Sequence, residues 1–203
     1  MRDKSMKHCL LKAKHCLNYT DKADFLAPLF LRLYLAPIMW MAGTKKFQNF
    51  SSTVEWFGND DWGLGLPFPT LLAGFVTATE ILGAIFLFIG FAVRWVSIPL
   101  LLTMLGAAVT VHLKNGWLAI AESDGFFANA RTMEAATRLE KAKEILQTHG
   151  NYEWLTEMGN FVVLNNGVEF AATYAVMLLS LFFIGSGSFV SVDYWMQQNE
   201  KNC

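Results

Sequence analysis

The sequence predicts an all-α integral membrane protein, a four-helix bundle with an outer-face amphipathic helix between its third and fourth spans. The first observation is compositional: 54% of the 203 residues are hydrophobic and only 16% are charged, against roughly 25% in soluble domains. The second is that four apolar segments each approach the roughly 20 residues that a helix needs to cross a bilayer. The net charge of −1 gives no basic surface for a nucleic-acid partner, so the lipid bilayer is the expected environment.

The four expected spans cover residues 25–44, 70–91, 93–113 and 167–186. Almost no residues separate the second span from the third, which predicts an antiparallel helical hairpin. Pro28, Pro37 and Pro99 lie inside expected spans and should kink their helices, because proline cannot donate the backbone hydrogen bond of a helix interior. Small residues in the second and third spans allow close helix contact: Gly74, Gly83, Gly90, Gly106 and Ala107.

Basic residues near the span ends predict the orientation, because cytoplasmic segments of membrane proteins carry more Lys and Arg. We therefore expect cytoplasmic tails at residues 1–24 and 187–203, outer loops at 45–69 and 114–166, and a location in a bacterial inner membrane. The first span lacks the features of a cleavable secretory signal and is interpreted as an uncleaved anchor. Six basic residues lie in the N-terminal tail: Arg2, Lys4, Lys7, Lys12, Lys14 and Lys22.

The second outer loop contains a predicted helix at about residues 129–150. Asn129 and Gly150 are suitable caps, and Glu134 and Arg138 are spaced to form an i,i+4 ion pair. Either this helix lies on the bilayer or the bundle mouth, or it docks a partner protein. Apolar residues recur along it at helical spacing: Met133, Ala136, Leu139, Ala142 and Leu146.

Two ionisable residues lie deep in the expected spans, where a charge is costly unless it is paired or hydrated. Arg32 lies in the first span and Glu80 in the second. A pair between them is the simplest way to keep both charges in the bundle. Such a pair is either a structural ion pair or part of a site for a head group, a quinone or another substrate.

Three further polar residues are expected at the outer ends of the spans. His112 and Glu169 end the third span and begin the fourth, and Lys46 follows the first. They predict a small polar mouth on the outer face, which serves structural hydrogen bonding or else ligand or proton chemistry, since histidine titrates near neutral pH.

The N-terminal tail repeats a Lys-His-Cys-Leu sequence after seven residues. The repeat places His8 and Cys9, then His15 and Cys16, on one helix face. Such Cys/His pairs suit Cu(I) or Zn, but they are weak metal candidates because a basic amphipathic tail on anionic lipid explains the same pattern. Met6 offers an alternative start. The sequence has no P-loop, dinucleotide-binding fingerprint, GxSxG or CxxC motif, so these patterns identify no enzyme class and no catalytic residue.

Several short motifs in order resemble the DoxX family of membrane proteins. They begin with Phe30-Leu31-Arg32-Leu33 and Gly43-Thr44-Lys45-Lys46-Phe47 in the first span, followed by Thr79-Glu80-Ile81-Leu82-Gly83 and Gly90-Phe91-Ala92-Val93-Arg94. Val111-His112, Asn165-Asn166-Gly167-Val168-Glu169, and Gly185-Ser186-Gly187 through Ser191-Val192-Asp193 complete the resemblance. It implies a four-helix inner-membrane protein that is often linked to redox or thiol stress.

The aromatic outer-loop motifs are similar to the HvfX subgroup of that family, which is associated with copper-binding modified peptides. They are Trp56-Phe57-Gly58-Asn59, Trp62-Gly63-Leu64-Gly65-Leu66-Pro67 and Asn151-Tyr152-Glu153-Trp154-Leu155. The resemblance implies an accessory protein that supports maturation, export or handling of such a peptide, with the peptide and its maturation proteins as partners. The alternative is the membrane subunit of a quinone-linked thiol or thiosulfate oxidoreductase. Copper and quinone are the corresponding ligands, and a homo-oligomer remains open.

Overall fold

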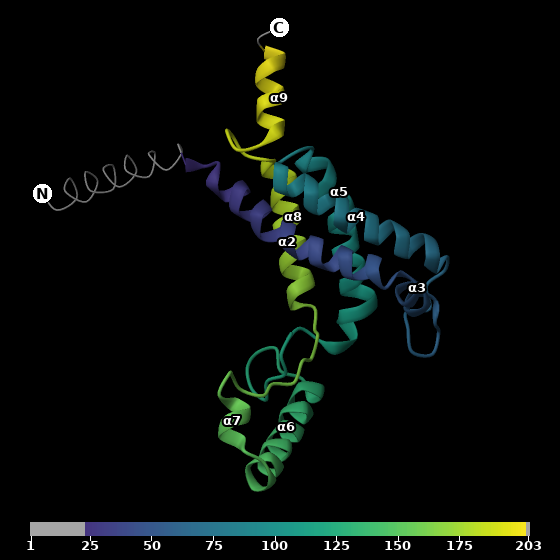
Figure 1. Ribbon diagram of the computed structural model, residues 1–203, viewed down its shortest axis with the longest axis vertical. Helices are drawn as coiled ribbons and strands as arrows, with labels where there is room; N and C mark the ends of the chain where they lie inside the picture. The colour runs from purple at the N-terminus through teal and green to yellow at the C-terminus, as the bar shows by residue number, and fades with distance from the viewer. Residues whose placement is uncertain (1–22, 202–203) are drawn as a thin grey trace, which may run out of the picture. The chain divides into compact units, whose positions relative to one another are not determined.

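A computed structural model describes residues 23–201, and this part of the chain is helical almost throughout (Figure 1). The all-α membrane fold class is confirmed. No strand forms between residues 23 and 201 beyond one isolated bridge that joins Ile120 to Leu164. The helices are α2 (Leu26–Gln48), α3 (Phe50–Gly58), α4 (Pro69–Ile89), α5 (Val93–Ala107), α6 (Ala130–His149), α7 (Tyr152–Thr156), α8 (Glu169–Ile184) and α9 (Val192–Lys201).

Three helical segments are long and apolar enough to cross a bilayer: Leu26–Gln48, Pro69–Ile89 and Val93–Asn115. The last is α5 with its continuation through a π turn (Ala108–His112) and a 3-10 turn (Leu113–Asn115). The fourth expected span forms an apolar helix, α8, of only 16 residues. At 1.5 Å per residue it is about 24 Å long, which is shorter than a hydrocarbon core of about 30 Å.

The chain divides into two compact units. Unit 1 comprises the residues up to Leu100 together with those from Met177 onward, and unit 2 comprises Leu101–Val176. Unit 1 therefore holds α2, α3, α4 and α9 with the first part of α5 and the last part of α8.

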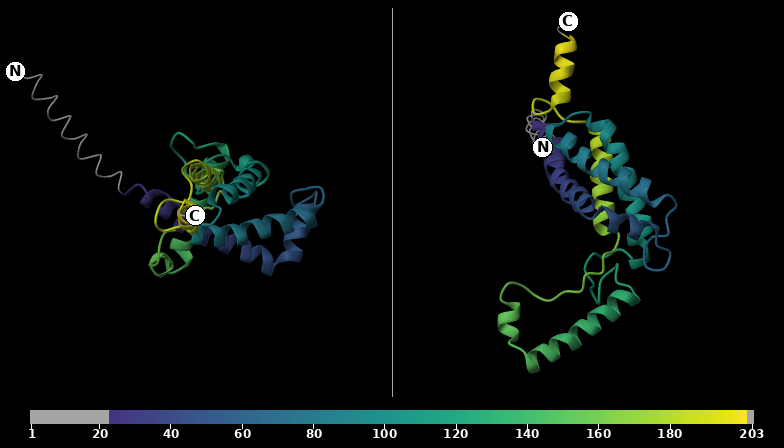
Figure 2. Two further views of the ribbon diagram at one scale, coloured as in Figure 1. Left: turned by 90° about the horizontal axis from the view of Figure 1, so that it is seen from above. Right: turned by 45° about the vertical axis from the view of Figure 1, so that its right-hand side comes forward.

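The centre of unit 1 is the packing of α2 along α4. Figures 1 and 2 show the two helices side by side, with α3 folded back at the end of α2 against α4. The approach is closest at Gly43, where an added Cβ would lie 2.7 Å from Ile81 and 3.0 Å from the Glu80 Cβ atom. The buried faces of these helices carry both apolar and polar side chains: Arg32, Leu35, Met39, Ala73, Thr77, Glu80, Ala84 and Leu87.

The expectations for proline and glycine hold only in part. Pro37 and Pro99 lie inside helices, as expected. Pro28 is the third residue of α2, so the kink predicted there is wrong. A proline in the first turn removes no helical hydrogen bond, because a first-turn N–H has no acceptor within the helix. Gly83 permits close packing, since a Cβ there would lie 2.8 Å from Leu100. A Cβ added at Gly106 would meet no atom of another residue's side chain or of a neighbouring segment within 4 Å.

The start of α9 closes the turn between α4 and α5. The Asp193 carboxylate accepts hydrogen bonds from the backbone N–H groups of Ala92 and Val93, at 2.7 and 3.1 Å. The Asp193 N–H donates to the Gly90 carbonyl at 3.1 Å. These bonds satisfy donors at the start of α5, which have no acceptor within the helix.

Unit 2 contains the predicted helix as α6, and its predicted caps and ion pair are confirmed. The Asn129 side chain forms a capping box with Thr132, and Gly150 follows the last residue. Arg138 pairs with Glu134, and the hydrogen bond to Glu140 raises the pKa of Lys143 above its ordinary value. Thr132 is the buried residue of α6, so this helix buries few of its side chains.

The close approach at Gly43 generates a stability prediction. Gly43→Ala should lower the stability of the purified protein by about 1–3 kcal/mol, because the new methyl group meets backbone and side-chain atoms of α4. The measurement is thermal unfolding in detergent. The matched control is Gly106→Ala, which has free space and should be neutral or slightly stabilising. Equal melting temperatures for the two variants would contradict the observed packing.

Candidate functional site

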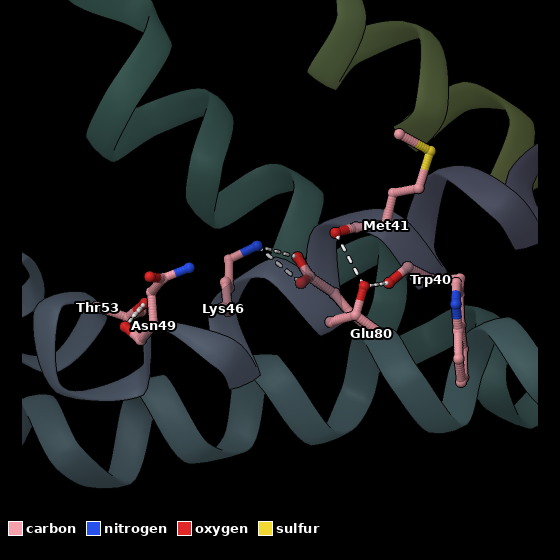
Figure 3. Close-up of polar contacts among 7 residues, drawn as sticks. Trp40, Met41, Lys46, Asn49, Thr53 and Glu80 are labelled. Atoms are coloured by element: carbon pink, nitrogen blue, oxygen red, sulfur yellow. Dashed lines mark hydrogen bonds and ion pairs between the residues drawn. The ribbon is translucent and has the colours of Figure 1, made fainter.

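The central feature of unit 1 is an ion pair between α2 and α4. The Lys46 Nζ atom lies 2.8 Å from Oε1 and 2.7 Å from Oε2 of Glu80 (Figure 3). The Glu80 side chain is 3% exposed and that of Lys46 is 26% exposed, so the carboxylate is enclosed while the ammonium keeps a route to the surface. Gly43 lies about one helical turn before Lys46 and lets the helices approach closely enough for this contact.

The same face of α4 carries a second polar group. Thr77 precedes Glu80 by three residues, and both side chains are buried. The Thr77 hydroxyl has no hydrogen-bond partner among the described residues. Buried hydroxyls in folded proteins are normally hydrogen-bonded, so an unpartnered one indicates a place for water or a ligand atom. Thr77 was not predictable as a site residue, because a threonine in an apolar segment gives no signal until its burial is known.

An apolar groove lies on the other side of Glu80 along the α2–α4 seam. It has a volume of about 420 Å³, within the roughly 300–1,000 Å³ of ordinary ligand pockets. Ala84, one turn after Glu80, forms part of its wall, and Pro37 forms another part. Because Pro37 has no N–H, the Leu33 carbonyl lacks its usual helical donor. The lining residues are Leu33, Ala36, Pro37, Trp40, Ala84, Ile85 and Phe88.

Arg32 does not pair with Glu80, so the expected ion pair is wrong. The Arg32 side chain is 1% exposed and donates to the Leu87 carbonyl at 3.3 Å and the Val190 carbonyl at 2.8 Å. Its Nε atom has no partner among the described residues, and the charge of Asp193 attracts the guanidinium.

The stagger of the two helices explains this difference. Gly43 lies level with Glu80, and Arg32 precedes Gly43 by 11 residues, about 16 Å along the helix. Arg32 therefore reaches the C-terminal end of α4, where carbonyl groups lack helical donors and carry partial negative charge. The sequence-based expectation assumed that the start of the first span and the end of the second lie at one level.

His112 and Glu169 lie in unit 2, where each binds backbone. His112 Nδ1 is 2.9 Å from the Asn166 carbonyl, and Glu169 Oε2 accepts the Ala119 N–H at 2.9 Å. Asn165 donates to two further carbonyls. Lys46, the third member of the expected mouth, belongs to unit 1 and has Glu80 as its partner.

The weak metal candidates of the tail, His8, Cys9, His15 and Cys16, lie outside the described residues. Between residues 23 and 201, no three His, Cys, Asp or Glu side chains are grouped so that they could hold a metal ion.

Comparison with known proteins places this arrangement in a family. Residues 27–113 match the DoxX family, and this region includes α2, α4, α5 and the Lys46–Glu80 pair. The chain is 34% identical over 104 residues to the protein of Bacillus subtilis (strain 168) named "Putative oxidoreductase CatD", which covers 51% of this chain and 73% of that relative. No solved structure matches significantly. This chain therefore belongs to the DoxX family of membrane proteins.

Proposed function

We propose that this chain is the quinone-binding membrane subunit of a thiol or thiosulfate oxidoreductase. The observation that carries the proposal is the enclosed Lys46–Glu80 pair between two apolar helices, because ionisable groups inside a membrane are costly and mark proton or substrate pathways. The name of the Bacillus subtilis relative supports an oxidoreductase. The substrate of the chain is then a lipid-soluble electron carrier.

The groove beside the pair suits such a carrier. A quinone head is a flat ring with two carbonyl oxygens, and its tail is apolar. The groove offers the aromatic rings of Trp40 and Phe88 for stacking and an otherwise apolar lining. In the reduced carrier, a hydroxyl group can donate to the Leu33 carbonyl that Pro37 leaves without a helical donor.

Glu80 and Thr77 supply the proton route. Reduction of a quinone requires two electrons and two protons, and oxidation of two thiols to a disulfide releases the same numbers, so the overall reaction is 2 RSH + quinone → RSSR + quinol. The thiols belong to a partner or substrate. In the proposal, water hydrogen-bonded to Thr77 delivers protons to Glu80, and Glu80 passes them to the quinone oxygen. Lys46 stabilises the carboxylate between transfers.

A quinone titration tests the proposal. Decylubiquinone should quench part of the tryptophan fluorescence of the reconstituted protein, and Trp40→Phe should remove the saturable part, because Trp40 lines the groove. Glu80→Gln should leave this binding nearly unchanged. It should lower thiol-dependent quinol formation in membranes by about 10²-fold or more, the usual contribution of a positioned acid or base.

The controls separate chemistry from folding. Glu55→Gln changes an exposed carboxylate of α3 in the same unit and should leave binding and rate unchanged. The double variant Lys46→Met/Glu80→Met removes both charges, so it should fold but remain slow. A normal rate of quinol formation in that variant would leave the pair with a structural role only.

As a second proposal, the chain handles a copper-binding modified peptide. Two features of unit 2 favour this role: its position outside most of the family match, and its polar cavity. Most of this unit lies beyond the DoxX match, which ends at residue 113. The HvfX-like loop motifs lie partly in the same unit. A cavity of about 290 Å³ in unit 2 is lined by Arg131, Glu134, Arg138 and Asn165 among others, and its cationic and amide groups suit a peptide carboxylate.

Charge reversal on α6 distinguishes this role. Arg138→Glu should lower copper tolerance of cells at least several-fold, because it places a second negative charge beside Glu134 in the cavity. Lys141→Glu makes the same charge change on the same helix at a residue outside the cavity lining and should behave as wild type. Wild-type copper tolerance in both variants would count against the peptide-handling role.

We also propose the orientation expected from the sequence, with both ends of the chain in the cytoplasm of a bacterium. Alkaline phosphatase fused after Asp60 or Gln147 should be active, because these loops would lie outside the inner membrane. The same enzyme fused after Gln198 should be inactive. The reverse pattern of activity would invert the orientation without changing the helices.

A further inference from the structure

A polar cavity lies in unit 1, away from the Lys46–Glu80 pair. It forms where α4 ends, α5 begins, α8 ends and α9 begins, and its volume is about 490 Å³. Unlike the groove between α2 and α4, it has a mostly polar lining. The polar side chains in this lining are Arg94, Ser186, Ser188, Asp193, Tyr194 and Gln197.

The cavity is rich in hydrogen-bond donors that have no partner. Arg94 uses one guanidinium N–H for the Phe183 carbonyl, at 3.1 Å, and its other N–H groups make no hydrogen bond to the described residues. The side chains of Ser186, Ser188 and Gln197 likewise have no hydrogen-bond partner between residues 23 and 201. Gly185, with φ +82°, lets the Arg94 Nε atom approach where a Cβ would be only 3.1 Å away.

The one carboxylate in the lining is already engaged. Asp193 accepts the N–H groups of Ala92 and Val93, and its charge also attracts the buried Arg32. The cation left without a carboxylate partner in this cavity is Arg94. A planar guanidinium with nearby hydroxyl groups is a common arrangement for binding phosphate oxygens.

The position of the cavity indicates the source of the phosphate. The apolar helices α4 and α8 end at Ile89 and Ile184 beside it, so it lies at an end of membrane-spanning structure. Large aromatic side chains near it are exposed: Trp95 is 77% exposed and Trp195 is 58% exposed. Exposed tryptophans are typical of the lipid head-group region.

We propose that this cavity binds the phosphate of an anionic phospholipid, with Arg94 as the main contact and Ser186 and Ser188 as further donors. The acyl chains then lie against the apolar side chains of α5 that follow Trp95 in the sequence. This site is separate from the proposed quinone site, and its chemistry holds for either orientation of the chain.

Native mass spectrometry of the purified full chain tests the proposal, with phosphatidylglycerol and phosphatidylcholine of identical acyl chains as probes. Phosphatidylglycerol should bind at least about fivefold more tightly. Arg94→Gln should weaken phosphatidylglycerol binding roughly tenfold, the effect of losing one charge-assisted contact. It should weaken phosphatidylcholine binding less, because the choline cation of that lipid already offsets its phosphate charge. Ser186→Ala/Ser188→Ala should weaken phosphatidylglycerol binding severalfold without removing the Arg94–Phe183 contact.

Lys141→Gln is the control, because it removes an exposed cation of unit 2 that lies outside the cavity beside Arg138, and it should bind both lipids as the wild type does. Equal binding of the two lipids by the wild type would overturn the proposal. Wild-type affinity for phosphatidylglycerol in the double serine variant would also overturn it, and this variant decides if Arg94→Gln does not fold. Displacement of phosphatidylglycerol by about equal concentrations of inorganic phosphate would assign the cavity to free phosphate instead.

Discussion

The structure of unit 1 depends on the need to give a buried carboxylate a cation within the membrane. A lone Glu80 inside apolar helices would be strongly destabilising, since the cost of transferring an isolated charge from water is large. Lys46 meets this need only if α2 and α4 approach closely, and Gly43 provides that approach because even a methyl group would collide with Ile81. Electrostatics and packing thus fix the same alignment of two helices.

That alignment determines where the other buried charge goes. With Gly43 level with Glu80, Arg32 reaches the end of α4 and binds the Leu87 carbonyl. The partial negative charge at the C-terminus of α4 therefore stabilises the Arg32 cation, as the Glu80 carboxylate stabilises the Lys46 cation. Arg94 has a similar place at the end of α8, through the Phe183 carbonyl. Arg32 ties the loop before α9 to α2 through the Val190 carbonyl, and Arg94 ties the start of α5 to the end of α8.

The parts of the fold that follow from local chemistry were predictable. Apolar length predicted four spans, and three of them form helices long enough to cross a bilayer. The Asn129 and Gly150 caps with the Glu134–Arg138 spacing predicted α6. The partner of Arg32 was not predictable, because hydropathy gives the length of a helix but not its stagger against a neighbour.

The candidate site was likewise only partly visible in the sequence. Glu80 and Lys46 were both candidates, but in different groups, since the contact between them is made by tertiary packing. Thr77 carries no sequence signal of its own, and the motifs that contain Arg94, Ser186 and Asp193 did not predict that these residues line one cavity. Their importance comes from hydrogen bonds that are absent among the described residues, and an absent bond can be seen only once the neighbours are known.

The extent of the family match bears on which proposed role is general. The match covers residues 27–113 and therefore both members of the Lys46–Glu80 pair. It excludes α6 and the cavity beside Arg138. A redox role at the pair would then belong to the part of the chain that defines the family, whereas peptide handling would belong to the part that lies beyond it. The two roles are compatible if the copper-binding peptide carries the thiols that are oxidised, because its recognition and its oxidation would then be successive steps on one substrate.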